Sequence, residues 1–193
     1  MSSDSPDELD ARDMERLAAG EDAALNSIIQ RHGEKLFHYL IRQLRDDGDA
    51  ADLAQETFVR VYQNRQKFDL RKSFSTWLYT IATNLIRNKF RWRQRHPEVS
   101  LEPNDDQAWR EPVAAGPSPS ESLQAEERAK EVRAAIQQLP LELRTCLLLS
   151  EYEGLAHLEI AAVMKCSAKA VESRLYRARQ HLRAALEKNF AEK

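Results

Sequence analysis

Residues 157–182 read HLEIAAVMKCSAKAVESRLYRARQHL, and their spacing decides the fold of the C-terminal part of the chain. A short segment with apolar residues at helical spacing comes first, marked by Leu158, Ala161, Ala162 and Met164. The pattern breaks at Lys165-Cys166-Ser167, and a longer helical repeat follows, formed by Val171, Leu175, Ala178 and Leu182. A short helix, a tight turn and a second amphipathic helix predict a helix-turn-helix, the arrangement that lets one helix enter the major groove of DNA.

The outer face of the second helix in this unit carries side chains that can read bases. If the apolar repeat faces inward, the 3.6-residue period places outward Lys169, Glu172, Ser173, Tyr176, Arg177 and Gln180. Arg177 can chelate guanine, Glu172 can accept from the cytosine amine, and Ser173 suits either partner. Three arginines flank this stripe and would neutralise phosphates without reading sequence: Arg174, Arg179 and Arg183. A solvated face with no DNA role is the alternative for this helix taken alone.

Apolar residues recur at helical spacing through the first half of the chain as well. One series runs through Leu25, Ile28, Ile29, His32, Leu36, Tyr39 and Leu40, and a second through Leu53, Thr57, Phe58, Val61 and Tyr62. Residues 46–48 break the pattern between them, and Asp49 is the expected N-cap of the second helix. A third helix is expected to begin after Ser73 or Ser75 and to continue to about Arg95, where His96-Pro97 ends it.

The composition changes between the two helical parts. Residues 97–122 contain five prolines, few aliphatic residues and many acids, which is typical of a linker. We therefore expect an all-α protein of two small helical domains joined by a flexible, acidic, proline-rich linker, with the helix-turn-helix in a C-terminal four-helix unit. The expected boundaries are an acidic N-terminal arm over 1–20, a first domain over 21–96, a linker over 97–124 and a second domain over 125–193. Trp109, the one aromatic residue of the linker, is a candidate for docking on a partner or on a neighbouring domain.

The charges of this 193-residue chain are segregated, although its formal net charge is only −2. Acids dominate the N-terminal arm and the linker. One run contains no acid and is formed by Arg87, Lys89, Arg91, Arg93 and Arg95. Because local potential attracts phosphate, a nearly neutral total is compatible with two basic DNA-binding faces.

Several other classes of protein do not fit the sequence. No apolar run approaches the roughly 20 residues of a membrane-spanning helix, and the N-terminus is acidic where a signal peptide is basic, so we expect a cytoplasmic protein with no membrane partner. Cys146 and Cys166 lack a CxxC spacing, which indicates incidental or buried thiols and neither a metal site nor a cofactor. The five histidines are scattered and no nucleophile-base spacing recurs, which argues against an enzyme.

Two pairs of stretches carry a family resemblance. The first pair is Asp49-Ala-Ala-Asp-Leu-Ala-Gln-Glu-Thr-Phe58 and Phe74-Ser-Thr-Trp-Leu-Tyr-Thr-Ile-Ala-Thr-Asn84. The second pair is Leu139-Pro140 with Glu159-Ile-Ala161, and Val171-Glu-Ser-Arg-Leu-Tyr-Arg-Ala-Arg179. In this order and separation they resemble the extracytoplasmic-function (ECF, group IV) sigma factors of the sigma-70 family, over nearly the whole chain beyond about Gly20.

The resemblance implies a sigma factor that binds core RNA polymerase and directs it to specific promoters. In the family an acidic helix docks on a coiled coil of the largest polymerase subunit, which by position assigns polymerase binding to Asp49, Asp52, Gln55 and Glu56. The alternative for Asp49 and Asp52 is that they only cap a helix. An anti-sigma protein that holds the factor inactive is a further partner implied by the family.

The family also assigns the two DNA-binding surfaces. The helix from Phe74 engages the minus-ten element and its melted non-template strand, with one stripe formed by Thr80, Asn84, Arg87, Asn88, Arg91 and Arg95. Phe68, in the loop before that helix, is a candidate for stacking on an extruded base, against the alternative that it is a core residue. The minus-thirty-five element is read from double-stranded DNA by the last helix, with Lys169, Glu172, Ser173, Arg174, Tyr176, Arg177 and Arg179.

Three positions depart from the family pattern. Lys165 stands where the turn usually offers glycine, so we expect a left-handed backbone conformation that is unfavourable for lysine. Ala156 stands where a capping serine is usual, which leaves Glu159 with half of a capping box. Glu172 replaces a residue that is usually basic, which changes the expected promoter preference. A stand-alone helix-turn-helix regulator that binds an operator without polymerase is the alternative function, although it would need a sensing or dimerising module.

Overall fold

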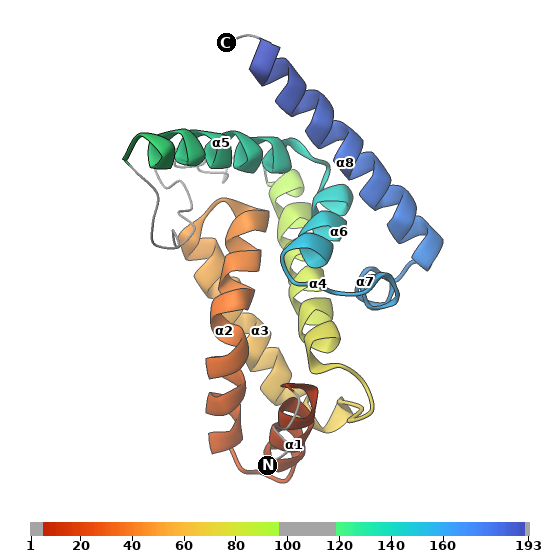
Figure 1. The fold of residues 1–193 in the computed structure, drawn as a ribbon. Helices are drawn as coiled ribbons and strands as arrows, with labels where there is room; N and C mark the ends of the chain where they lie inside the picture. The colour runs from red at the N-terminus through yellow and green to blue at the C-terminus, as the bar shows by residue number, and fades with distance from the viewer. Residues whose placement is uncertain (1–5, 97–118, 192–193) are drawn as a thin grey trace.

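A computed structural model describes residues 6–96 and 119–191, with side chains over 6–96 and 126–187. The described residues form eight α-helices and a short 3₁₀ helix, η1, and contain no strand. In chain order they are α1 (Pro6–Ala18), α2 (Ala23–Leu44), α3 (Asp47–Gln63), η1 (Arg65–Lys67), α4 (Phe74–Arg95), α5 (Pro119–Gln138), α6 (Leu141–Glu151), α7 (His157–Met164) and α8 (Ala168–Ala191). The N-terminal half is 6–96 and the C-terminal half is 119–191, and the two lie side by side (Figure 1). The prediction of an all-α fold is confirmed.

The helix boundaries in the N-terminal half follow from capping. The hydroxyl of Ser73 accepts a hydrogen bond from the Thr76 amide, 3.5 Å away, and α4 begins at the next residue, as predicted. The N-cap of α3 is Asp46, whose carboxylate accepts from the Asp49 amide at 2.6 Å. The prediction of Asp49 as N-cap was therefore wrong, because the helix begins two residues earlier and Asp49 lies within its first turn.

The predicted acidic arm is instead a packed helix. Residues 6–18 form α1, which buries Met14 and Leu17 against α2. Asp10 and Asp13 are also buried, because Arg31 of α2 donates to both carboxylates at 2.9 and 2.7 Å. His32 adds a contact of 2.8 Å to Asp10. The sequence indicated a solvated acidic arm, but these two acids hold α1 in place, since a buried carboxylate requires a charged partner.

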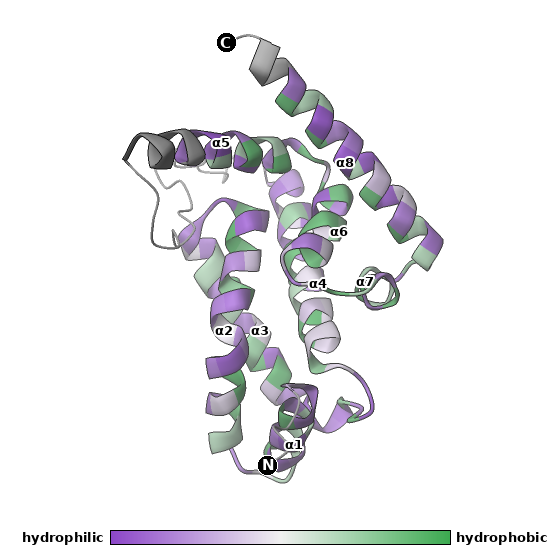
Figure 2. Ribbon diagram, viewed as in Figure 1, coloured by the Kyte–Doolittle hydropathy of each residue, from purple (hydrophilic) through white to green (hydrophobic). Residues whose placement is uncertain are grey.

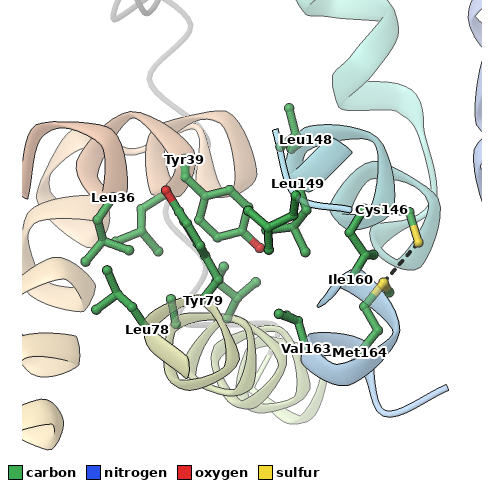
Figure 3. Packing of buried hydrophobic residues seen from close by; sticks show 14 of the residues in the cluster. Leu36, Tyr39, Leu78, Tyr79, Cys146, Leu148, Leu149, Ile160, Val163 and Met164 are labelled. Carbon is green, nitrogen blue, oxygen red and sulfur yellow. Dashed lines mark hydrogen bonds between the residues drawn. The ribbon is translucent and has the colours of Figure 1, made fainter. Parts of the chain in front are cut away.

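The two halves share one apolar core. Figure 3 shows Leu148 and Leu149 of α6 beside Tyr39 of α2, and Val163 of α7 directed toward α4. All four side chains are fully buried. The two predicted helical domains are therefore in contact with each other in this arrangement of the chain. The physical reason is that α6 and α7 carry more apolar surface than α5 and α8 cover, and contact with α2 and α4 removes the remainder from water.

Part of the predicted linker is helical, since α5 begins at Pro119. Residues 97–118 lie outside the described residues, and so does the expected docking role of Trp109. Among the helices over 6–96 and 119–191, none is both long enough and apolar enough to cross a membrane.

Candidate nucleic-acid and polymerase interfaces

The helix-turn-helix forms as predicted from α7, a turn at Lys165–Ser167 and α8. Lys165 has φ 54° and ψ 49°, the left-handed conformation expected of the position where the family has glycine. The turn is held by the Cys166 amide, which donates to the Ala161 carbonyl at 3.0 Å. At the start of α7 the Ala156 amide donates to the Glu159 carboxylate at 2.9 Å, so the expected half of a capping box is present. Leu158 in the first turn of α7 is 76% exposed and does not join the core.

The predicted inner and outer faces of α8 are both found. Val171, Leu175 and Ala178 are buried and Leu182 is partly buried. The outer stripe is exposed and consists of Lys169, Glu172, Ser173, Tyr176, Arg177 and Gln180. Hydrophilic residues line much of α8 as it runs along the outside of the molecule (Figures 1 and 2). The stripe is therefore accessible enough for α8 to enter a DNA groove, even though the two halves are in contact.

The arginines beside the stripe pair with acids of the same chain. Arg179 donates to Glu151 at 2.8 Å, and Arg183 donates to Glu187 at 2.7 Å, in both cases at exposed positions. Arg174 is half-buried, with one guanidinium nitrogen 3.1 Å from the Cys166 sulfur and another 3.7 Å from Glu142. The exposed pairs of Arg179 and Arg183 contribute little to stability and can exchange for phosphate contacts.

The predicted stripe of α4 is exposed at its C-terminal end and covered nearer its start. Asn88, Arg91 and Arg95 are exposed. Thr80, Asn84 and Arg87 are half-buried, because α4 packs against α7 and lies near α6. Arg87 donates through two guanidinium nitrogens to the two oxygens of Glu142 of α6, each at 3.2 Å. The stripe exists as a helical face, but the C-terminal half covers part of it.

Glu142 connects the two predicted DNA-binding helices. Its carboxylate accepts from Arg87 of α4 and lies 3.7 Å from a guanidinium nitrogen of Arg174 of α8. Both arginines are predicted DNA contacts, one for each promoter element. One carboxylate therefore partly neutralises a cation from each surface while the halves are in contact.

The predicted polymerase-binding residues lie together on α3 but differ in environment. Asp52 and Gln55 are exposed, and Glu56 is half-buried and accepts from Arg60 at 2.7 Å. Asp49 faces α4, where its two oxygens accept from Lys89 and Arg93. The sequence did not indicate this contact, because the two cations are 40 and 44 positions away from Asp49.

A buried polar network holds the two halves together. The Tyr79 hydroxyl of α4 donates to Glu153, which follows α6, and Arg42 of α2 lies 3.9 Å from the same carboxylate. Burial raises the pKa of Glu153, and burial together with the nearby Glu153 charge raises the pKa of Tyr79. Arg144 of α6 donates to Gln43 of α2 at 3.2 Å, and burial lowers its pKa to about 10. The interface combines this hydrogen-bonded network with the apolar core.

Phe68 and Cys146 both contact residues of the hydrophobic core. Phe68 is partly buried, with its ring 5.8 Å from Phe74 and 5.0 Å from Trp77, in agreement with the core alternative. The Cys146 thiol is buried 3.0 Å from the Met164 sulfur, and burial raises its pKa to about 11 (Figure 3). One exposed aromatic residue was not singled out in the sequence: Trp92, near the end of α4, is 48% exposed.

The comparisons with known proteins match both halves. Residues 28–96 match the family Sigma-70 region 2, and residues 129–182 match Sigma-70, region 4. The RNA polymerase sigma-H factor of Pseudomonas aeruginosa is 35% identical over 93% of this chain and 95% of that protein. The ECF RNA polymerase sigma-E factor of Escherichia coli K12 is 32% identical over 86% of this chain and 88% of that protein.

Solved structures agree with these matches. The structure of CnrH in complex with the cytosolic domain of CnrY superposes with a TM-score of 0.69 at 26% identity, over 93% of this chain and 98% of that one. The sigma factor RpoE of Bartonella quintana, solved with the anti-sigma factor NepR, has a TM-score of 0.65 at 23% identity over 84% and 96% of the two chains. The second likeness concerns the fold alone.

Two helical halves, one of which presents an open helix-turn-helix, define a helix-turn-helix DNA-binding protein. The family matches make the class specific: the chain belongs to the ECF sigma factors of the sigma-70 family. It therefore serves as a subunit that binds RNA polymerase and directs it to promoters, and the alternative of a stand-alone regulator is set aside.

Proposed function

We propose that the two halves divide promoter recognition between α4 and α8. One observation carries the proposal: each helix sets a face with exposed arginines opposite a face that is buried in the core. In this division residues 21–96 serve as region 2, residues 125–193 as region 4, and 97–124 as the linker between them. The matched ranges 28–96 and 129–182 lie inside these boundaries.

The polymerase docks on α3 in this proposal. Asp52 and Gln55 are exposed on one helix surface, next to Glu56 and Asp49. An acidic patch of this kind complements a basic coiled coil and speeds its association. Arg60 pairs with Glu56 across one turn and would have to give way to the partner's cations.

The minus-ten element contacts the exposed end of α4 first. Asn88, Arg91 and Arg95 are available in the arrangement described, whereas Arg87 is engaged by Glu142. Thr80 and Asn84 lie further toward the covered end. Full use of this surface requires the C-terminal half to move away from α4, so we infer that the arrangement described is a resting state and that polymerase binding separates the halves.

The minus-thirty-five element is read by α8. Arg177 and Ser173 are the central base-reading side chains, and Lys169, Glu172 and Tyr176 flank them on the same exposed stripe. Arg174 and Arg179 fix the register through phosphates once they leave Glu142 and Glu151. Glu172 lies 4.0 Å from His157 of α7, which gives its carboxylate a cationic neighbour whenever the imidazole is protonated.

The proposal includes a cytoplasmic location and an anti-sigma partner. The sigma factor RpoE of Bartonella quintana was solved with the anti-sigma factor NepR, and CnrH was solved with the cytosolic domain of CnrY. The similarity of this chain's fold to both supports a comparable protein partner here. Affinity capture from native lysate tests this part. Recovery of polymerase subunits alone, under stressed and resting conditions alike, would count against an anti-sigma protein.

Run-off transcription from a promoter library, with and without core polymerase, tests the function as a whole. We expect specific transcripts only when the chain and core are both present, and weak DNA binding by the chain alone. Sequence-specific operator binding by the chain alone, without any effect on core, would overturn the proposal.

A further inference from the structure

The C-terminal end of α4 carries an aromatic surface that none of the roles above uses. Trp92 is 48% exposed, which is unusual for so large an apolar side chain. The ring of His96 stacks on the indole, with centroids 4.8 Å apart and planes 24° from parallel. The His96 Nδ1 lies 3.0 Å from the Trp92 carbonyl oxygen, which fixes the imidazole over the indole.

An open cavity of about 240 Å³ lies next to this stacked pair. It is lined by Asn88, Arg91, Trp92 and Arg95, which share one helix face because they are spaced by three, four and seven positions. Arg91 donates to the Asn88 side-chain oxygen at 2.6 Å, so one wall of the cavity is ordered. The indole forms an apolar wall, and two guanidinium groups stand beside it.

The charge around the cavity selects the kind of ligand. The sequence from Arg87 to Arg95 contains no acid, so Arg91 and Arg95 favour an anionic chain. A flat aromatic face with cations at its edge is the combination by which proteins bind unpaired bases and their phosphates. Asn88 adds an amide that can bond to the edge of a base, as asparagine does with adenine.

We propose that Trp92 and His96 form a stacking platform for an unpaired base of single-stranded DNA, with the adjacent phosphates held by Arg91 and Arg95. The base lies on the indole in the cavity, and His96 supports the indole. The inference deepens the proposed function and rests on it, because it gives the exposed end of α4 a specific contact with the melted strand. Since Trp92 is exposed while the halves are in contact, the platform is accessible before they separate.

Oligonucleotides with and without bases test the platform in the full chain. Fluorescence anisotropy compares a labelled oligothymidine with a strand of equal length made of abasic sites, which keeps the phosphates. We expect the wild-type chain to prefer the strand with bases by about fivefold or more, the effect of one stacked base. Trp92→Leu removes that preference, Trp92→Phe keeps part of it, and Gln94→Ala, at an exposed position two residues away, leaves it unchanged.

Charge variants separate stacking from phosphate binding. Arg91→Ala and Arg95→Ala are expected to weaken both strands equally. The platform is refuted if the wild-type chain binds the two strands equally, if Trp92→Leu keeps the preference, or if Trp92→Leu weakens both strands alike. Run-off transcription with the same wild-type preparation distinguishes failure of the platform from failure of the proposed function. If the chain supports specific transcripts but shows no preference for the strand with bases, only the platform is refuted. If it supports no specific transcripts, the proposed function is refuted.

Discussion

The two DNA-facing helices differ in how far their own chain covers them. On α8 the outer stripe is exposed along its length, and its flanking arginines pair with acids at the surface. On α4 the part of the stripe nearer the helix start lies against the other half, and Arg87 is paired with Glu142 of that half. The difference indicates that α8 is ready to bind while α4 depends on a change in the contact between the halves.

The largest effect is expected from removing Arg177, the central base-contacting side chain of α8. We expect Arg177→Ala to reduce run-off from a cognate promoter by about ten- to hundredfold, because one bidentate contact to guanine discriminates by about 1–3 kcal/mol. Arg183→Ala, a matched loss of charge at a flanking phosphate-contacting position further along the helix, is the control and should have a smaller effect. Equal losses in both variants would mean that α8 contributes charge and does not read sequence.

The next effect concerns the two arginines that face Glu142, which are Arg87 of α4 and Arg174 of α8. Glu142→Gln removes the charge that faces Arg87 and Arg174, so we expect the isolated chain to bind promoter duplex roughly three- to tenfold more tightly at low salt. The slope of log K against log salt should steepen by about 1 to 2, because each further phosphate that an arginine neutralises adds about 0.9 to the slope.

Glu151→Gln is the matched control for this measurement. It frees Arg179 alone, at an exposed pair on α8, so it should produce the smaller change. If Glu142→Gln and Glu151→Gln tightened DNA binding equally, the gain would come from net charge alone. The proposed difference between a covered α4 and an open α8 would then not hold.

A smaller effect is expected at the turn that aims α8. Lys165→Gly relieves the left-handed strain and should stabilise the fold by about 1 kcal/mol, which corresponds to a rise of about 2–4 °C in Tm. Lys165→Ala keeps the strain and removes the same charge, so it should give no such gain. A rise with alanine equal to that with glycine would trace the effect to charge and not to the backbone. Thermal unfolding followed by circular dichroism measures both.

The smallest effect is a pH dependence at the contact that covers α4. Burial raises the pKa of Glu153, although Tyr79, Arg42 and Lys35 face the carboxyl group and oppose this shift in part. A raised folded-state pKa favours the protonated form, so its stabilisation is complete below the unfolded value near 4.5 and is lost as pH rises through the folded value. Glu153→Gln imitates the protonated carboxyl and should escape this loss.

Tm measured from about pH 4 upward checks the sign, with a difference on the order of 1–2 °C in favour of the glutamine variant at the upper end. Glu151→Gln controls for the removal of one exposed charge. A Tm of the wild-type chain that rises relative to Glu153→Gln with increasing pH would contradict the expectation.

Local features of the fold were predictable from the sequence, and long-range ones were not. The start of α4 directly after Ser73, its end near His96 and the inner face of α8 follow from capping and periodicity, which act within a few residues. The packing of α1 could not be predicted, because Asp10 and Asp13 lie at positions where a solvated helix would also carry acids.

The contact that covers α4 could not be predicted from the sequence for a related reason. Arg87 and Glu142 are 55 positions apart, and Tyr79 and Glu153 are 74 apart. No local spacing records such pairs, because only tertiary packing brings them together. The stripe residues could be named in advance, but their exposure could not.

Glu142, which faces an arginine from each DNA-binding helix, also bears on how the factor is distributed in a cell. A genome offers about a million or more competing non-specific sites, so a factor with all its arginines available would spend much of its time on irrelevant DNA. By shielding Arg87 and Arg174, the carboxylate lowers that background occupancy and leaves a larger share of molecules diffusing and able to meet polymerase. We therefore expect Glu142→Gln to be retained longer on bulk DNA, a disadvantage that would offset its tighter promoter binding.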